Sequence, residues 1–264
     1  MDITIPTLNS SAHLEEVINA VVSCIFVDRI IVADGGSTDS TLDILRRYGA
    51  EVVPDGGSLG AARDILIHAA TSKYFLTLDA DVVLQKGDWC LEALSLLESG
   101  TDCVVLQMDM VGPLQDFISF YSRFMKRKGL FFATMATFFS KEAIKDIRIP
   151  KQLDGSEDLY IMLWLLDHKR KIATLKVPGI HYHSSSPSKG RWVGAGVRNL
   201  QKVVGRRKVF PIIFRNIILY PFTLTFAAVC TLNWPLEKYG AGLWIEYVRG
   251  YLSGKYTRAM KKDW

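Results

Sequence analysis

The first half of the chain alternates between short apolar runs and longer segments whose apolar residues recur at helical spacing. The i, i+3, i+4, i+7, i+8 pattern of an amphipathic helix is followed by Leu14, Val17, Ile18, Val21 and Val22. The patterns predict strands at residues 3–6, 29–34, 50–53 and 73–78, and helices at residues 14–22, 37–49 and 59–71. This alternation favours an α/β fold with a mostly parallel central sheet flanked by helices.

Similar patterns continue beyond residue 88. They predict helices at residues 89–99 and 113–128, a strand at 102–110, a helix from residue 156 and a strand at 171–177. The helix over residues 113–128 carries an aromatic stripe made of Phe117, Phe120, Tyr121 and Phe124. Such a stripe more often faces a core than an acceptor, and we favour the core-facing interpretation.

Charge is distributed unevenly along the chain, whose formal net charge is +5. Residues 168–236 contain twelve of the 32 Lys and Arg residues and none of the 27 Asp and Glu residues. Such a basic tract predicts an anionic partner, which could be phosphate, lipid headgroups or nucleic acid. The four cysteines are scattered without a C-x-x-C pair, so the sequence suggests neither a zinc site nor a disulfide framework.

An uncharged segment of 21 residues, 216–236, follows a cluster of basic residues. Its length approaches that of a membrane span, but Pro221 and Pro235 interrupt it. We favour a helix that docks at the membrane interface over a true span or an ordinary buried helix. The neighbouring basic residues favour the cytoplasmic face of the cell membrane, with an anionic membrane surface as partner.

Carboxylates follow two of the predicted strands. Asp79 and Asp81 come directly after the apolar strand at 73–78, and side chains at i and i+2 of an extended segment point the same way. Asp34, in a glycine-rich turn, follows the strand at 29–34. Ligands of open parallel sheets bind beyond the carboxyl ends of the strands, and carboxylates suit Mg²⁺ or Mn²⁺. A D-x-D triplet alone could equally be a turn or a helix cap.

Four segments in order and spacing resemble family-two glycosyltransferases with the GT-A fold. They are "IPTLNSSAHLEEVINAV", "VADGGSTDSTLDIL", "GSLGAARDILIHAATSKYFLTLDADVVL" and "DGSEDLYIMLWL". The resemblance covers roughly residues 1–200. It implies a nucleotide-sugar-binding and catalytic domain over residues 1–200, which leaves residues 201–264 as a basic, apolar helical extension that associates with the membrane.

The resemblance also implies a donor site. It assigns Pro6, Thr7 and Asn9 to the nucleotide pocket, Asp34 to the base and Arg63 to the diphosphate region. Arg63 has a plainer alternative, in which its long side chain only extends from a helix towards water.

The implied catalytic groups are carboxylates. Asp79 and Asp81 match the family's D-x-D motif, which binds the ribose and, through a divalent cation, the diphosphate. Asp158 matches the catalytic base, with Glu157 beside it. Asp158 could also serve only as a helix cap. The set implies an inverting transfer that depends on Mg²⁺ or Mn²⁺.

Two further elements match the family in part. Some glycosyltransferases of this fold add a histidine to the metal shell, which makes His183 a candidate metal ligand and His181 the alternative. Arg191 and Trp192 match the end of the family's Q-x-x-R-W element and are expected to contact diphosphate and acceptor. Ser188 stands where that element has glutamine, which argues against processive polymer synthesis.

The sequence therefore favours a glycosyltransferase that uses a UDP- or GDP-sugar and a polar or lipid-phosphate acceptor at the membrane. One alternative is a soluble glycosyltransferase that acts on a small molecule or protein. Another is a basic nucleic-acid-binding module, which we disfavour because the apolar run interrupts the basic tract and no nucleic-acid motif accompanies it. Nucleic acid is thus not an expected partner.

Overall fold

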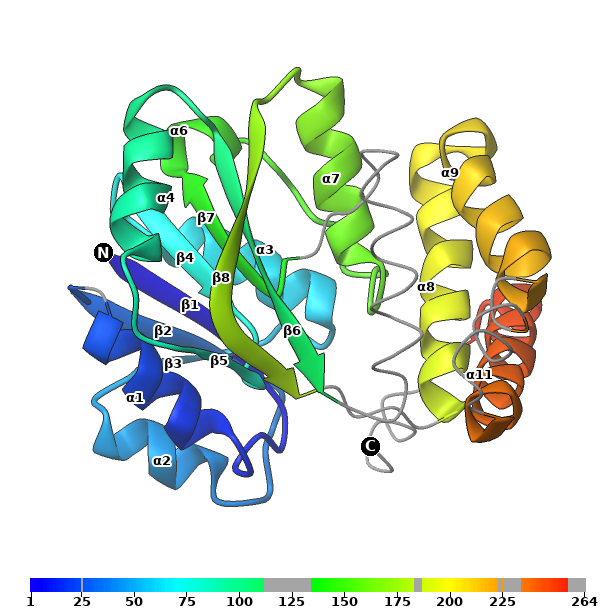
Figure 1. The fold of residues 1–264 in the computed structure, drawn as a ribbon, viewed down its shortest axis with the longest axis horizontal. Helices are drawn as coiled ribbons and strands as arrows, with labels where there is room; N and C mark the ends of the chain where they lie inside the picture. Colours follow the sequence, from blue (N-terminus) through cyan, green and yellow to red (C-terminus); the bar gives the residue numbers. More distant parts are fainter. Residues whose placement is uncertain (25, 112–133, 183–186, 223–224, 226–233, 256–264) are drawn as a thin grey trace. The chain divides into compact units, whose positions relative to one another are not determined.

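The structure is a computed structural model that describes residues 1–24, 26–111, 134–182, 187–222, 225 and 234–255 (Figure 1). The chain forms two compact units. The first unit comprises Met1–Asp109, Phe132–Gln152 and Ile161–His181, and the second comprises Met110–Phe131, Leu153–Tyr160 and Tyr182–Trp264. The expected domain boundary after residue 200 stays a prediction.

The first unit is built on an eight-stranded sheet with the order β3-β2-β1-β4-β7-β6-β8-β5. The strands are β1 (Asp2–Thr7), β2 (Arg29–Asp34), β3 (Glu51–Pro54), β4 (Tyr74–Leu78), β5 (Val82–Leu84), β6 (Cys103–Val111), β7 (Ala136–Ser140) and β8 (Ile172–Tyr182). The pairings among β3, β2, β1 and β4 are parallel. The carboxyl ends of these four strands therefore lie at one edge of the sheet, which we call the carboxyl edge.

Helices flank this curled sheet (Figure 1). They are α1 (Leu14–Cys24), α2 (Thr41–Arg47), α3 (Leu59–Ala69), α4 (Trp89–Glu98) and α6 (Lys141–Ile144). Ser58 begins α3 because its hydroxyl accepts a hydrogen bond from Ala61 N at 3.0 Å. Gly49 and Gly100 follow α2 and α4 at φ +62° and +94°, a left-handed conformation that glycine adopts at no steric cost.

The core lies on both faces of the sheet. Phe75 of β4 and Phe139 of β7 are fully buried and stack with ring centroids 5.7 Å apart. One cluster between β2 and α3 contains Ile31, Ala33, Ala62 and Leu66. Central strands covered on both faces have nearly continuous runs of buried residues, as β1 does.

The predicted α/β architecture is confirmed, and β3, β2, β1 and β4 form a parallel block within a mixed sheet. Strand β7 is antiparallel to β4 and to β6, and β5 is antiparallel to β8. The sequence patterns did not indicate β5, β7 or α6. These elements have only three to five residues, a length at which periodicity cannot distinguish a strand from a helix. The helix expected at residues 113–128 lies outside the described residues.

Most of the second unit that the structure describes is helical. Its elements are α8 (Pro187–Val204), α9 (Arg206–Ile213), the π-helix η1 (Phe214–Leu219), α11 (Trp234–Ser253) and the start of α7 (Glu157–Asp167). Helices α8 and α11 lie side by side (Figure 1). A Cβ atom on Gly190 or Gly194 of α8 would lie within 2.1 Å of a carbonyl oxygen of α11. The two backbones therefore approach closely because glycine has no side chain.

Part of the apolar segment at 216–236 lies outside the described residues, namely 223–224 and 226–233. Among the helices that the structure describes, none combines the length and the apolar character needed to cross a membrane.

Candidate active site

The loop after β2 holds the carboxylate of Asp34 at the carboxyl edge. Asp34 Oδ1 accepts hydrogen bonds from Thr7 Oγ1 at 3.1 Å and Ser37 Oγ at 2.6 Å. Asp34 Oδ2 accepts from the backbone N–H groups of Gly36 at 2.8 Å and Ser37 at 2.9 Å. A carboxylate has about four lone-pair positions, and all four are engaged here. A nucleotide base that donates to Asp34 must therefore displace a hydroxyl of Thr7 or Ser37.

Asn9 joins the loop after β1 to the loop after β2. Its backbone N–H donates to Ser37 Oγ at 2.8 Å, and its Oδ1 accepts from Thr38 N at 2.8 Å. Asn9 adopts φ +51°, a left-handed conformation that asparagine tolerates better than most residues. Pro6 lies at the end of β1 in register with Ala33 of β2. The residues assigned to the nucleotide pocket thus form one hydrogen-bonded loop pair.

Asp39 supports the same loops from the start of α2. Its carboxylate accepts hydrogen bonds from Thr41 Oγ1 at 2.5 Å and from Ser11 N at 3.1 Å. Partial burial works to raise the pKa of Asp39, but the hydrogen bonds from Thr41 and Ser11 outweigh it and lower the pKa to about 2. Asp39 is therefore ionised at neutral pH and fixes the loop that carries Asn9.

Arg63 of α3 is a buried cation beneath the D-x-D turn. Only 2% of Arg63 is exposed, and its Nη1 donates to Thr77 Oγ1 at 2.9 Å. Its Nη2 forms an ion pair with Asp79 Oδ1. A buried guanidinium is costly unless it is paired, so this contact fixes both partners. The structure thus brings Arg63 and Asp79 together, and Arg63 does not extend into water.

Asp81 lies near the histidine of β8. Strands β5 and β8 pair with Val82 opposite His181, and His181 Nε2 lies 3.4 Å from Asp81 Oδ1. His181 is buried, whereas the Asp81 side chain is 38% exposed. The structure thus places His181, the alternative candidate, beside the D-x-D turn. His183 lies outside the described residues.

The oxygen donors of Asp79 and Asp81 suit a hard divalent cation. Within the described part of the chain, no group of three or more His, Cys, Asp or Glu side chains is arranged to hold an ion. Mg²⁺ usually needs only one or two protein carboxylates when substrate phosphates and water complete its shell. The two partly exposed carboxylates at the carboxyl edge therefore fit a cation that binds together with a diphosphate.

The carboxylates of the "SED" segment belong to the second unit. Glu157 is buried, and Asp158 is partly exposed in the first turn of α7. Ser156, which precedes them, adopts φ +65° and is buried. A Cβ atom on Gly196 of α8 would lie 2.5 Å from Gly155 O and 2.9 Å from Ser156 Oγ. Helix α8 therefore packs directly against the turn that presents Glu157 and Asp158.

Arg191 and Trp192 lie on α8 in the second unit, and each contacts protein groups. Arg191 Nη2 lies 2.6 Å from Glu246 Oε2 of α11. A Cβ atom on Gly155 would lie 2.9 Å from Cε2 of Trp192, so the indole rests against the backbone of the "DGSED" turn. Neither the Glu246 partner nor the glycine contact had a signal in the sequence.

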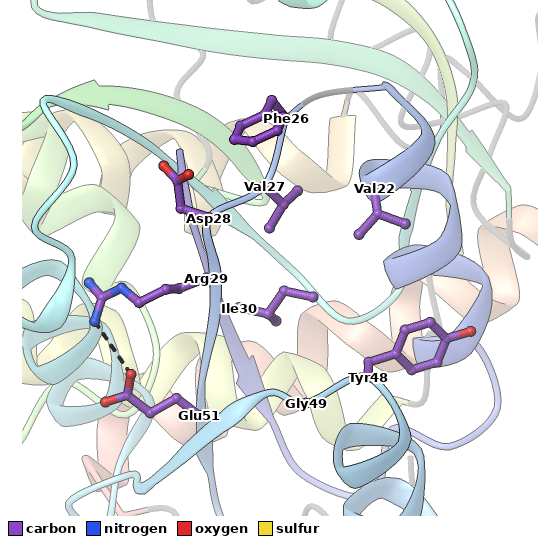
Figure 2. A pocket seen from close by; sticks show the side chains of 9 residues that line it. All are labelled: Val22, Phe26, Val27, Asp28, Arg29, Ile30, Tyr48, Gly49 and Glu51. Carbon is purple, nitrogen blue, oxygen red and sulfur yellow. Dashed lines mark hydrogen bonds and ion pairs between the residues drawn. The ribbon is translucent and has the colours of Figure 1, made fainter.

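A cavity of about 570 Å³ lies elsewhere on the first unit, at the amino ends of β2 and β3 (Figure 2). Its lining includes Val22, Phe26, Arg29, Tyr48 and Glu51. Arg29 Nη1 lies 3.4 Å from Glu51 Oε2, the contact drawn as a dashed line. This cavity is at the opposite end of the strands from Asp34 and Asp79, so it is not the site expected for a nucleotide.

The chain is similar in sequence to known proteins over the region that contains this site. Residues 2–149 match the family described as "Glycosyl transferase family 2". The chain is 32% identical over 121 residues to the succinoglycan biosynthesis protein ExoA of Rhizobium meliloti (strain 1021), a match that covers 42% of this chain. The matched region is 36% of ExoA, so the chain spans about a third of the length of this relative.

Solved structures of glucosyl-3-phosphoglycerate synthase from Mycobacterium tuberculosis have a similar fold. The complex with Mn²⁺, UDP and glucosyl-3-phosphoglycerate has a TM-score of 0.59 and 17% identity over 76% of this chain and 78% of that chain. The complex with Mn²⁺, UDP-glucose and phosphoglyceric acid has a TM-score of 0.60 at the same identity and coverage. The predicted GT-A-type fold is confirmed by these likenesses.

Proposed function

This chain belongs to glycosyl transferase family 2, and we propose that it transfers a sugar from a nucleoside-diphosphate donor to an acceptor. The observation that carries the proposal is the group formed by Arg63, Asp79 and Asp81 at the carboxyl edge, inside the segment that matches the family. This edge is where open α/β sheets bind nucleotides, and its groups suit a diphosphate and its cation.

We propose that Asp79 and Asp81 hold Mg²⁺ or Mn²⁺, with His181 beside Asp81. When bound, the cation would neutralise the negative charge that grows on the leaving diphosphate. Arg63 holds Asp79 in place through its ion pair and adds a fixed positive charge close to the diphosphate region. Mn²⁺ and Mg²⁺ are bound with UDP in the structures of the mycobacterial synthase, which supports this choice of ions.

The loops after β1 and β2 bind the nucleoside in this proposal. Asn9 and Asp34 are held by hydrogen bonds between the two loops, so the pocket needs little ordering when the nucleotide arrives. The donor is a UDP- or GDP-sugar. UDP and UDP-glucose bound to the mycobacterial synthase favour a UDP-sugar.

Asp158 is the proposed catalytic base. It takes the proton of the acceptor hydroxyl as that oxygen attacks C1 of the donor sugar and the nucleoside diphosphate leaves. Because this is a single displacement, the anomeric configuration inverts. The partly exposed Asp158 suits a group that meets an acceptor, whereas the buried Glu157 suits a supporting role.

The proposed acceptor carries phosphate on a lipid and is met at the cytoplasmic face of the membrane. The basic composition of residues 168–236 supports an acceptor that bears phosphate. A lipid carrier would also account for the apolar character of the residues that follow.

Transfer by Asp158→Asn tests the assignment of the base. Radiolabelled UDP-glucose and other sugar nucleotides are offered with a polyprenyl phosphate, and product is measured with and without Mn²⁺. We expect Asp158→Asn to lower the rate of transfer by about 10²–10⁴-fold, the usual contribution of a general base. The affinity for the donor should remain near that of the wild type. Asp167→Asn, at the exposed far end of the same helix α7, is the matched control and should retain transfer.

Two results would overturn the role of Asp158. One is a variant that retains wild-type transfer, and the other is a variant that loses donor affinity along with transfer. Transfer that proceeds equally in EDTA would contradict the proposed cation.

A further inference from the structure

Helix α9, the π-helix η1 and the three helical residues that follow, together residues 206–222, have two distinct faces. The inner face packs on the rest of the second unit. Val209 is fully buried, Asn216 Nδ2 donates to Tyr247 Oη at 3.2 Å, and Trp244 Nε1 donates to Ile217 O at 3.3 Å. These contacts with α11 fix which face points outward.

The outer face is apolar and exposed. Exposed fractions are 55% for Phe210, 45% for Phe214, 48% for Ile218, 41% for Leu219 and 72% for Phe222. Each exposed fraction is large for a hydrophobic side chain. We call these five residues the docking face.

The π-helix keeps the docking face in line. Phe210, Phe214, Ile218 and Phe222 are spaced by four residues. Four residues exceed the 3.6 per turn of an α-helix, so such a row drifts around the axis. A π-helix closes i→i+5 bonds and holds more residues per turn, so the row drifts back over η1. Stacking of the Phe210 and Phe214 rings, with centroids 6.2 Å apart, is consistent with one stripe.

A basic triplet adjoins the docking face. Arg206, Arg207 and Lys208 are exposed in the first turn of α9. Cations are disfavoured there, because the helix macrodipole is positive at its amino end. Residues 206–222 contain no Asp or Glu, so every charged side chain in this segment is positive. An anionic surface complements such a segment.

We propose that this face docks on an anionic lipid bilayer, with the docking face in the acyl boundary and the basic triplet on lipid phosphates. Aromatic and aliphatic residues beside Lys and Arg are the composition of interfacial helices. A second copy of the chain fits less well, since the face offers no carboxylate to the basic triplet of a partner. Docking at this face would bring the enzyme to its lipid-linked acceptor. Only this link to the acceptor rests on the proposed function, and the docking itself does not.

Sedimentation of the full chain with vesicles tests the proposal without donor or acceptor, so that docking and transfer can fail separately. We expect binding to vesicles of phosphatidylglycerol and phosphatidylcholine, and little binding to phosphatidylcholine alone. The triple variant R206Q/R207Q/K208Q should weaken binding by about a hundredfold, because each juxtamembrane cation contributes about fivefold. The double variant F210S/F214S should weaken it by at least about tenfold.

Matched controls come from the first unit. Leu91→Ser removes a side chain that is 70% exposed on α4, and R46Q/R47Q removes two adjacent cations of α2. Both should bind vesicles as the wild type does. Three results would overturn the proposal: a protein that stays in the supernatant, equal binding to phosphatidylcholine alone, and a lipid-independent dimer that F210S/F214S dissociates.

Discussion

At the scale of single residues, two ion pairs, each with one buried partner, organise the first unit at opposite ends of its strands. Asp2 is 1% exposed at the start of β1, where it accepts hydrogen bonds from Arg29 Nη2 at 2.8 Å and from the backbone of Thr71 and Ser72. Burial works to raise the pKa of Asp2, but these donors hold it well below its usual range. Asp2 therefore stays ionised in the fold.

Asp2→Asn should lower the free energy of unfolding at pH 7 by about 2 kcal/mol, since it replaces charge-assisted hydrogen bonds with weaker ones. The stabilisation by Asp2 is complete above its unfolded pKa of about 4 and is lost as the pH falls towards the lower folded pKa. Urea unfolding of the wild type and Asp2→Asn between pH 7 and pH 2.5 measures the difference in their free energies of unfolding. The difference between them should shrink with acid. A difference that is constant over this range would contradict the pairing.

The other pair, Arg63 with Asp79, lies at the carboxyl edge. Arg63→Met should cost about 3 kcal/mol of unfolding free energy, because it removes one partner of a largely buried ion pair. It should also weaken donor binding by at least about tenfold. The control Thr77→Val removes only the hydroxyl that accepts from Arg63, so it should cost about 1 kcal/mol and retain donor affinity. Calorimetric titration with UDP-glucose and Mn²⁺ distinguishes the two. Wild-type affinity in Arg63→Met would exclude a role in the donor site.

The D-x-D pair was predictable from the sequence, but the side chains that contact it were not. The apolar run of β4 shows where the strand ends and so where Asp79 and Asp81 lie, but residues 79–81 form the turn between β4 and β5 instead of an extended strand. The contact with Arg63 joins residues 16 apart, and that of His181 with Asp81 joins residues 100 apart. Local patterns carry no information about such contacts. The sequence limited the candidate metal-binding histidine to His181 and His183, because both follow the last predicted strand.

At the scale of elements, glycine contacts position the segment that carries the proposed base. In a helix with room for a methyl group, replacing Gly196 with Ala would stabilise the fold by up to about 1 kcal/mol through helix propensity. The carbonyl oxygen of Gly155 would lie 2.5 Å from that methyl, so we expect a net loss of about 1–3 kcal/mol instead. Transfer should fall while donor affinity is retained. The control Asn199→Ala, one turn later on α8, should be neutral or slightly stabilising.

These two variants are compared by thermal unfolding and by transfer assay. A stabilised and fully active Gly196→Ala would show that α8 does not position the "DGSED" turn. The close approach of α8 to this turn had no signal in the sequence, because a G-x-G within a basic helix does not indicate what it packs against.

Element prediction succeeded in the alternating strands and helices near the start of the chain, whereas α8, a helix of 18 residues, was not predicted. The first four strands and the helices between them were predicted within a few residues, since each has clear periodicity and a cap or a glycine at its end. Strand β7 was missed because it ends a longer, mostly apolar run, residues 130–139, in which neither a helical nor a strand period marks a separate element. Its place between β4 and β6 makes the sheet mixed.

At the scale of the whole molecule, the chain divides its proposed tasks between two units. The first holds the nucleotide loops and the D-x-D turn, and the second holds Asp158, the basic tract of α9 and the docking face. The charge distribution predicted an anionic partner for the basic region. It could not distinguish lipid from phosphate, because both present the same chemistry to Arg and Lys.

The central claim is that this chain binds a nucleotide sugar through a cation held by Asp79 and Asp81. Thermal unfolding with a panel of UDP- and GDP-sugars tests it most directly, with Mn²⁺, Mg²⁺ or EDTA. A donor at a hundred times its Kd should stabilise the fold by about 2.7 kcal/mol. We predict this stabilisation for the wild type with either ion and for the control Asp88→Asn, and its loss in EDTA and in Asp81→Asn. Absence of stabilisation by every sugar nucleotide, or equal stabilisation in EDTA, would contradict the claim.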